Sequence, residues 1–366
     1  MSKSSFDKWF VTLALLIVMG GVVFHFVKSD RKVQSQKQKQ PGAQSDFSES
    51  YDFHPYYSPS VPRPSNGVPE QAARIAKLPR EKVEAWLAKH SRDAVSLLAA
   101  FRALDDTNYL NEAATNFPNN PQVELAVLAR DEFPADRRKW LDLFKVSSPS
   151  NSLANYLSAE DCFKNGNTVA AVQELQAATG KSQFDNYTVA SELTGEELAQ
   201  FCGESPLQAY QTAISGVATE ELPELATFKR LAQGIEQLQT QEMTAGDNTS
   251  AQNLAQMGMV LGNQLINGGG SGLLINQLLG IAVERIVLSQ LDSNTGYDFL
   301  DGKTPNQVSQ ELGEQKKEMT QTYQSFNAVY PNLTEAEMLN YLDRKKTYGE
   351  MNAMRWVVQQ HPPGNP

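Results

Sequence analysis

Residues 151–180 read NSLANYLSAEDCFKNGNTVAAVQELQAATG, and this stretch decides the expected fold. Its first half has apolar or small side chains at helical rather than alternating spacing, namely Leu153, Tyr156, Leu157, Ala159 and Phe163. The next three residues tolerate left-handed backbone and end the helix: Asn165, Gly166 and Asn167. A second helical stripe continues at Val169, Val172, Leu175 and Ala178. The stretch therefore predicts two antiparallel helices joined by a tight turn.

The second half of this stretch resembles a tetratricopeptide (TPR) repeat. The residues that match the family's turn, small and large packing positions are Gly166, Ala171, Leu175 and Ala178. The first helix departs from the family's pattern, because Asn155 and Ser158 stand where the family has a large aromatic residue and a leucine. The resemblance covers 30 residues and implies a unit that is stacked on similar units.

The resemblance also implies an inner groove lined by the first helix of each repeat. If the family's geometry carries over, the groove of this repeat is lined by Tyr156, Glu160, Phe163 and Lys164. These four residues are the candidate contacts for a protein or peptide partner. For Tyr156 and Phe163 the alternative is a place in the hydrophobic core.

Two earlier hairpins extend the pattern, one over residues 91–120 and one over residues 121–150. Leu110, Leu141 and Leu175 stand at equivalent positions of the second helices, at spacings of 31 and 34 residues. Stacked helical hairpins produce such a period. We therefore expect an all-α fold with TPR-like stacked hairpins, and a generic helical bundle is the alternative.

Composition agrees with a helical protein and limits its partners. The chain has 366 residues, 40% of them hydrophobic, and few alternating β-branched runs. Residues 1–40 contain seven Lys or Arg and two Asp or Glu, whereas the rest contains 25 basic and 40 acidic residues. An acidic globular part repels phosphate backbones, so we expect no binding of nucleic acid. The two cysteines, Cys162 and Cys202, fit buried apolar positions, and a disulfide between them stays open.

The amino-terminal part predicts a membrane anchor with flanks over residues 1–32. Residues 9–27 contain no charged side chain, and 19 residues at about 1.5 Å rise nearly cross a bilayer core. A cleaved signal peptide is the alternative, but the apolar run is longer than usual and lacks small residues at its end. Basic residues are more numerous after the span than before it, which favours a cytoplasmic globular part. Single amino-terminal anchors more often export the chain that comes after them, so we expect the exported, periplasmic face.

The remaining chain divides into three parts by composition. Residues 33–68 are rich in Gln, Ser and Pro and are expected to form a disordered linker. Residues 69–240 are expected to form the TPR-like helical domain. Residues 241–366 are expected to form a carboxyl-terminal helical domain with an apolar hairpin over residues 252–291. In this hairpin Gly258 and Gly262 lie four residues apart, so that one helix face can approach a neighbour closely.

The sequence shows no motif for catalysis, cofactor binding or metal binding. The glycines of residues 268–272 are followed by Leu273 and Leu274, where a phosphate-binding loop needs Lys and Ser or Thr. No pattern of His and Cys matches a zinc site. We therefore name no catalytic, cofactor-binding or metal-binding residue and expect no cofactor.

Three functions are compatible with these features. The first is a membrane-tethered helical-repeat scaffold or adaptor that binds a protein or peptide. The second is an envelope-associated, hydrolase-like enzyme with a site between the two helical domains, which we favour less. The third is a structural subunit that associates with further copies of itself. The chain also resembles bacterial proteins that have an amino-terminal anchor and degenerate TPR-like helices, but this resemblance implies no activity.

Overall fold

The computed structural model describes residues 78–268 and 272–362, which belong to one compact unit over residues 77–366. Within these ranges the protein is all-helical: it contains no strand, and a single isolated bridge pairs Asn151 with Gln183. The prediction of an all-α protein is confirmed. The predicted anchor at residues 9–27 and the predicted linker at residues 33–68 lie outside the described residues. None of the described helices combines the length and the hydropathy that a membrane crossing requires.

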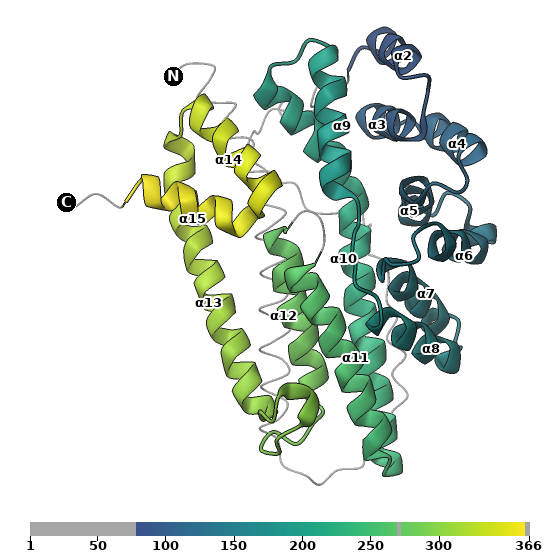
Figure 1. Ribbon diagram of the computed structural model, residues 1–366, viewed down its shortest axis with the longest axis vertical. Coiled ribbons are helices and arrows are strands. Elements are labelled where there is room, and N and C mark those ends of the chain that lie inside the picture. The colour runs from purple at the N-terminus through teal and green to yellow at the C-terminus, as the bar shows by residue number, and fades with distance from the viewer. Residues whose placement is uncertain (1–77, 269–271, 363–366) are drawn as a thin grey trace, which may run out of the picture. The chain divides into compact units, whose positions relative to one another are not determined.

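The described part of the chain begins with seven helices of 10 to 12 residues each (Figure 1). They are α2 (Arg80–Lys89), α3 (Ala94–Leu104), α4 (Thr107–Asn116), α5 (Pro121–Arg130), α6 (Arg137–Ser147), α7 (Leu153–Lys164) and α8 (Thr168–Thr179). Side chains that accept hydrogen bonds from backbone amides cap several of them, among them Asp93, Asp106, Asn120 and Asn167. Each of the three predicted hairpins is thus a pair of helices, α3–α4, α5–α6 and α7–α8.

The hairpins bury the positions that the sequence period singled out. Leu110, Leu141 and Leu175 are each completely buried on the second helix of their hairpin. The turn between α7 and α8 contains Gly166 at a φ of 72°, a left-handed conformation that glycine adopts without strain. Each helix from α3 to α7 packs on the next one along the chain. The local pattern of the sequence therefore places both the helices and their buried sides.

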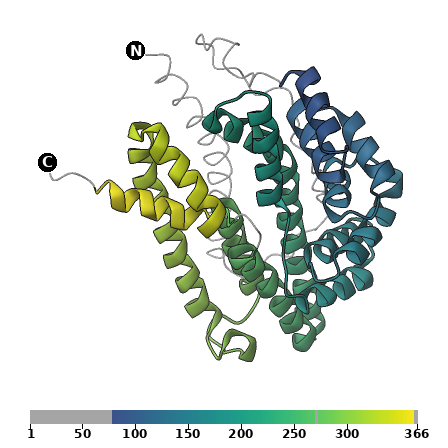
Figure 2. The same cartoon turned by 45° about the horizontal axis from the view of Figure 1, so that its top comes forward.

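The longest helix, α10 (Pro206–Ala245), comes after α9 (Thr188–Phe201) and packs against the first helix of each hairpin, α3, α5 and α7. Figures 1 and 2 show α2 to α8 arranged along one side of α10. Ser205 and Gln208 form a capping box at its start. A proline usually marks the start or the end of a helix, but α10 continues through Pro223. The predicted domain boundary after residue 240 also falls inside α10, and the division into two domains stays a prediction.

The apolar hairpin consists of α11 (Asn248–Asn267) and α12 (Leu274–Leu288), which pack closely on each other and on α10. A methyl group added at Gly258 would lie 2.5 Å from Cγ1 of Val287, and one at Gly262 would lie 2.2 Å from Cγ of Glu284. Only glycine permits such an approach of the two helices. The expected close contact at Gly258 and Gly262 is therefore present.

Three more helices complete the chain, α13 (Pro305–Val329), α14 (Glu335–Tyr348) and α15 (Glu350–Gln360), with short 3₁₀ turns at Pro134–Asp136, Asp298–Leu300 and Tyr330–Asn332. A buried cluster joins α14 to α9 and α10: Lys345 Nζ donates to Glu192 Oε1 and to the hydroxyl of Tyr210, each at 3.0 Å. Burial alone would lower the pKa of Lys345, but Tyr210 and Glu192 outweigh it and raise this pKa. The cluster fixes α14 to the rest of the unit.

Candidate protein-binding groove

The four residues predicted to line the inner groove lie on α7, and α10 covers most of them. Tyr156 is completely buried, Glu160 is 6% exposed, and Phe163 is partly exposed. Lys164, at the end of α7, is exposed. A methyl group added at Gly234 of α10 would lie 3.2 Å from the ring of Phe163. The structure therefore places the chain's own helix against this face.

Tyr156 is held by a polar contact and an aromatic cluster. Its hydroxyl donates to Gln264 Oε1 of α11 at 2.8 Å. Its ring lies 6.3 Å from that of Phe184 and 6.5 Å from that of Phe228 on α10, centroid to centroid. Burial raises the pKa of the Tyr156 hydroxyl well above its usual value. Tyr156 therefore joins α7 to α10 and α11 from inside the unit.

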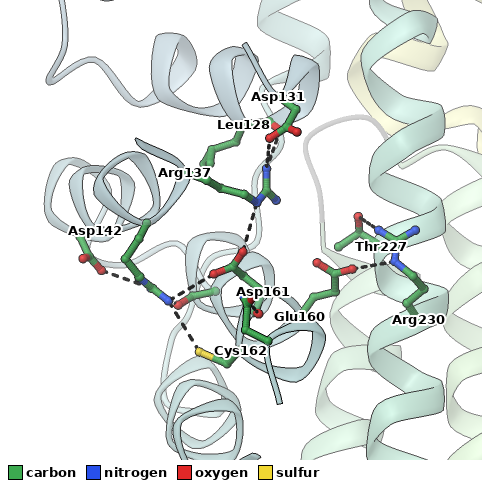
Figure 3. Close-up of polar contacts among 12 residues, drawn as sticks. Leu128, Asp131, Arg137, Asp142, Glu160, Asp161, Cys162, Thr227 and Arg230 are labelled. Atoms are coloured by element: carbon green, nitrogen blue, oxygen red, sulfur yellow. Dashed lines mark hydrogen bonds and ion pairs between the residues drawn. The ribbon is translucent and has the colours of Figure 1, made fainter. Parts of the chain in front are cut away.

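Glu160 forms an ion pair with α10 (Figure 3). Arg230 Nε donates to Glu160 Oε1 at 2.6 Å, and Arg230 Nη2 donates to Thr227 Oγ1 at 2.9 Å. The guanidinium is partly exposed whereas the carboxylate is buried. Glu160 is thus occupied by a residue of the same chain, and its predicted contact with a partner stays a prediction.

A second polar network on α7, away from Glu160, joins α7 to α6 (Figure 3). It reaches α8 through Glu174. Asp161 lies 3.4 Å from Arg137 Nε and 3.8 Å from Arg138 Nη1. Arg138 also donates to Ser158 Oγ, and its Nη1 lies 3.6 Å from Cys162 Sγ. These contacts hold neighbouring helices together, and the charges of the carboxylates and guanidinium groups are paired with one another.

Glu174 of α8 is the other centre of this network. It accepts hydrogen bonds from Lys145 Nζ at 2.7 Å, Asn155 Nδ2 at 2.7 Å and Ser158 Oγ at 2.8 Å. Burial alone would raise the pKa of Glu174, but the bonds from Lys145 and Ser158 outweigh it and keep this pKa below its usual value. The two residues that depart from the family's pattern, Asn155 and Ser158, therefore have a clear role, because both are bound to Glu174.

Both cysteines and two buried carboxyl groups lie away from the two hollows described below. Cys162 and Cys202 are both buried and free. Burial raises the pKa of Glu124 and of Glu284 to about 7. A catalytic role would require such a group to face a cleft together with other reactive groups. Neither carboxyl group lines either of the two hollows described below, and no group of three potential metal ligands occurs in the described part of the chain.

An open groove lies between α8, α10 and α11. Its volume is about 580 Å³, within the range of protein ligand sites. It is lined by Val172, Gln176, Thr179, Leu238, Glu242, Ser250, Asn253, Leu254, Gln256, Met257 and Val260. The apolar members form a floor flanked by hydroxyl and carboxamide groups, and Glu242 is the only charged residue among them. A smaller hollow of about 240 Å³ lies near Leu333 and Trp356.

The sequence pattern assigned Leu254 and Met257 to an apolar helix face but did not reveal this groove. Three helices from residues 172 to 260 form it, and periodicity within one helix cannot reveal contacts over that distance. One signal was present in the sequence: the 20 residues of α11 include no Asp, Glu, Lys or Arg.

Comparison of the chain with family models, with curated proteins and with solved structures gives no match. The proposed function therefore depends on the geometry of the chain itself.

Proposed function

We propose that this protein is a membrane-tethered, TPR-like helical-repeat scaffold that binds a segment of another protein in the groove between α8, α10 and α11. The proposal includes an amino-terminal anchor at residues 9–27 and a globular part on the exported face. The single observation that carries the binding role is the groove itself, a sizeable hollow with a partly apolar floor. Such a surface is typical of sites that bind a peptide or small ligand.

The TPR-like part of the proposal is supported by the hairpins. The helices α3, α5 and α7 each begin a hairpin and each contact α10, whereas α4, α6 and α8 each complete one. The buried residues Leu110, Leu141 and Leu175 recur at a period of just over 30 residues. In this arrangement α10 occupies the face on which a partner would be expected in the related family, and binding is displaced to the surface between α8 and α11.

Site-specific photocrosslinking tests the proposal. A photoreactive amino acid replaces Gln256, an exposed groove residue, and the matched control carries it at Gln321, an exposed glutamine of α13. In intact membranes we expect one or a few defined protein adducts from position 256 and none of these from position 321.

A second substitution defines the adducts further. Replacing Val260 by Arg in the groove should remove the adducts of position 256 because it places a charge on the apolar floor. Identical adducts from positions 256 and 321 would contradict the proposal. An adduct with a second copy of the chain would instead support the self-associating structural subunit.

A further inference from the structure

Helix α11 has an unusual surface for a helix of its length. About a quarter of the residues in a typical soluble domain are charged, so that 20 residues would carry about five charges. Helix α11 carries none. Its exposed polar side chains include a series of carboxamides, Gln252, Asn253, Gln256, Asn263 and Asn267. The polar surface of α11 therefore offers hydrogen bonds without formal charge.

The carboxamides of the groove differ from that of Gln264, a partly buried residue of the same helix. Gln264 Oε1 accepts from the hydroxyls of Tyr156 and Ser152, each at 2.8 Å, and its Nε2 donates to Lys181 O at 3.3 Å. By contrast, the side-chain amides of Asn253 and Gln256 make no hydrogen bond to another residue in the described ranges. Gln264 has a structural role, whereas Asn253 and Gln256 are available to a ligand.

Both sides of the groove carry such groups. Gln176 of α8 faces the groove from one side, and Asn253 and Gln256 of α11 line the other. Between them, Val172 and Met257 are partly buried. The groove thus combines an apolar floor with donors and acceptors on both sides.

We infer that the groove binds an extended polypeptide segment, uncharged over its central part, by its main chain. This inference rests on the proposed function and names the chemistry of its partner. A carboxamide offers one acceptor and two donors, so it can pair with the C=O and N–H groups of an extended chain. Apolar side chains of the partner lie on the floor. A charged side chain at that place would be buried without a partner, which is costly.

Glu242 is expected to set the orientation of the bound segment. It is the only charged residue that lines the groove, and it lies near the end of α10. A lysine or arginine at one end of the bound segment would pair with it. The lining has no aromatic ring on which a sugar could stack, which favours a polypeptide over a neutral oligosaccharide.

Peptide selection on the full-length chain tests this inference. The protein, in detergent micelles, is used to select from a library of displayed random peptides of about twelve residues, and the affinities of the enriched peptides are then measured by calorimetry. We expect enriched peptides to be uncharged over their central part, with a basic residue at one end. Their affinity should change by about fivefold or less between about 0.05 and 0.5 M salt, because a single pair with Glu242 is the only ion pair expected in the site.

Variants assign the interaction to the groove. Replacing Asn253 and Gln256 together by Ala should weaken binding by roughly tenfold or more, because two hydrogen bonds to the main chain are lost. Glu242→Gln should remove the preference for the terminal basic residue and leave the rest of the affinity unchanged. Gln321→Ala on α13 is the matched control and should have no effect.

The outcomes distinguish the inference from the proposed function. Two outcomes would overturn the inference and leave the binding role in place. In the first, peptides bind in the groove with strong salt dependence. In the second, their affinity is unchanged by the carboxamide variants but is lost with Val260→Arg. Selection of no peptide, or of peptides unaffected by every groove variant, would overturn both. Tight binding of a neutral oligosaccharide at the same residues would overturn the inference in favour of a glycan ligand.

Discussion

The face of α7 that meets α10 and the face of α11 that borders the groove are both polar, but only the first is paired within the chain. Glu160 and Tyr156 of α7 have partners on α10 and α11. Asn253 and Gln256 of α11 have none among the described residues. Residue type alone therefore does not distinguish a structural polar residue from a ligand-binding one, whereas the presence of a partner in the fold does.

The largest expected difference between the two faces is in stability. Tyr156→Ala should lower the free energy of unfolding by about 3–5 kcal/mol, because it leaves a cavity between α7 and α10 and removes a hydrogen bond to Gln264. Met257→Ala in the groove should cost about 1 kcal/mol at most, since Met257 is partly exposed. Urea unfolding of the full-length chain, followed by circular dichroism, measures both.

Tyr156→Phe is the matched control for the hydrogen bond and should cost about 1 kcal/mol. Equal losses of unfolding free energy for Tyr156→Ala and Met257→Ala would contradict the distinction between the closed face, where α7 meets α10, and the open face, where α11 borders the groove.

The close contact of α11 with α12 should make the stability of the fold depend on pH, because Glu284 of α12 is buried against Gly262 of α11. The folded pKa of Glu284 is raised from 4.5 to about 7 by burial beside Gly262, so the protonated form is favoured in the folded state. The stability contributed by this group is fully present below pH 4.5 and is lost as the pH rises through 7. The loss amounts to about 3 kcal/mol at about 1.4 kcal/mol for each pH unit.

Glu284→Gln, which is neutral at all these pH values, should therefore be more stable than the natural chain at about pH 8 and similar to it at about pH 4.5. The difference between the two proteins is the quantity to measure, because Glu124 also has a raised pKa and affects both equally. A difference that does not change with pH would show that Glu284 is not buried as described.

Glycine-to-alanine substitutions should change stability in opposite directions on the packed side of α11 and on an open helix surface. Gly262→Ala should destabilise the fold by about 1–3 kcal/mol, because the added methyl group meets Glu284 and the backbone of Gly280. Gly313→Ala on α13 meets no atom within 4 Å and should stabilise the fold by roughly 0.5–1 kcal/mol. Thermal unfolding of the two variants should give shifts of opposite sign, and the same sign for both would contradict the close approach of α11 and α12.

The smallest effect on stability is expected in the groove. Asn253→Ala and Gln256→Ala should each change the free energy of unfolding by about 0.5 kcal/mol or less, because neither side chain has a partner in the described part of the chain. The two substitutions together should weaken peptide binding by roughly tenfold or more. A large loss of stability for either variant in urea unfolding would show that its carboxamide has a structural role like that of Gln264.

The hairpins could be predicted because their signals are local. The turn at Gly166 and the apolar spacing along each helix act within a few residues of the structure that they specify, and Leu110, Leu141 and Leu175 are each buried within their own hairpin. The same holds for the glycines of α11, whose spacing of four residues places both on one face.

The long helix and the groove could not be predicted in the same way. A proline usually begins a helix or ends one, yet α10 continues through Pro223 and packs against α3, α5 and α7. A capping pattern at Thr194 likewise lies inside α9, where the Thr194 hydroxyl donates to Ala190 O. The contact between Glu160 and Arg230 joins residues 70 positions apart, and no periodicity reports it.

The most direct test of the difference between the closed and the open face is a comparison of thiol labelling at the two. In a chain with Cys162 and Cys202 replaced by Ala, a single cysteine is placed at Glu160 or at Gln256, and its reaction with a maleimide is timed with and without the selected peptide. We expect slow labelling at position 160, unchanged by peptide, and fast labelling at position 256 that the peptide slows. Fast labelling at position 160 that the peptide slows, with no protection at position 256, would contradict the proposed groove.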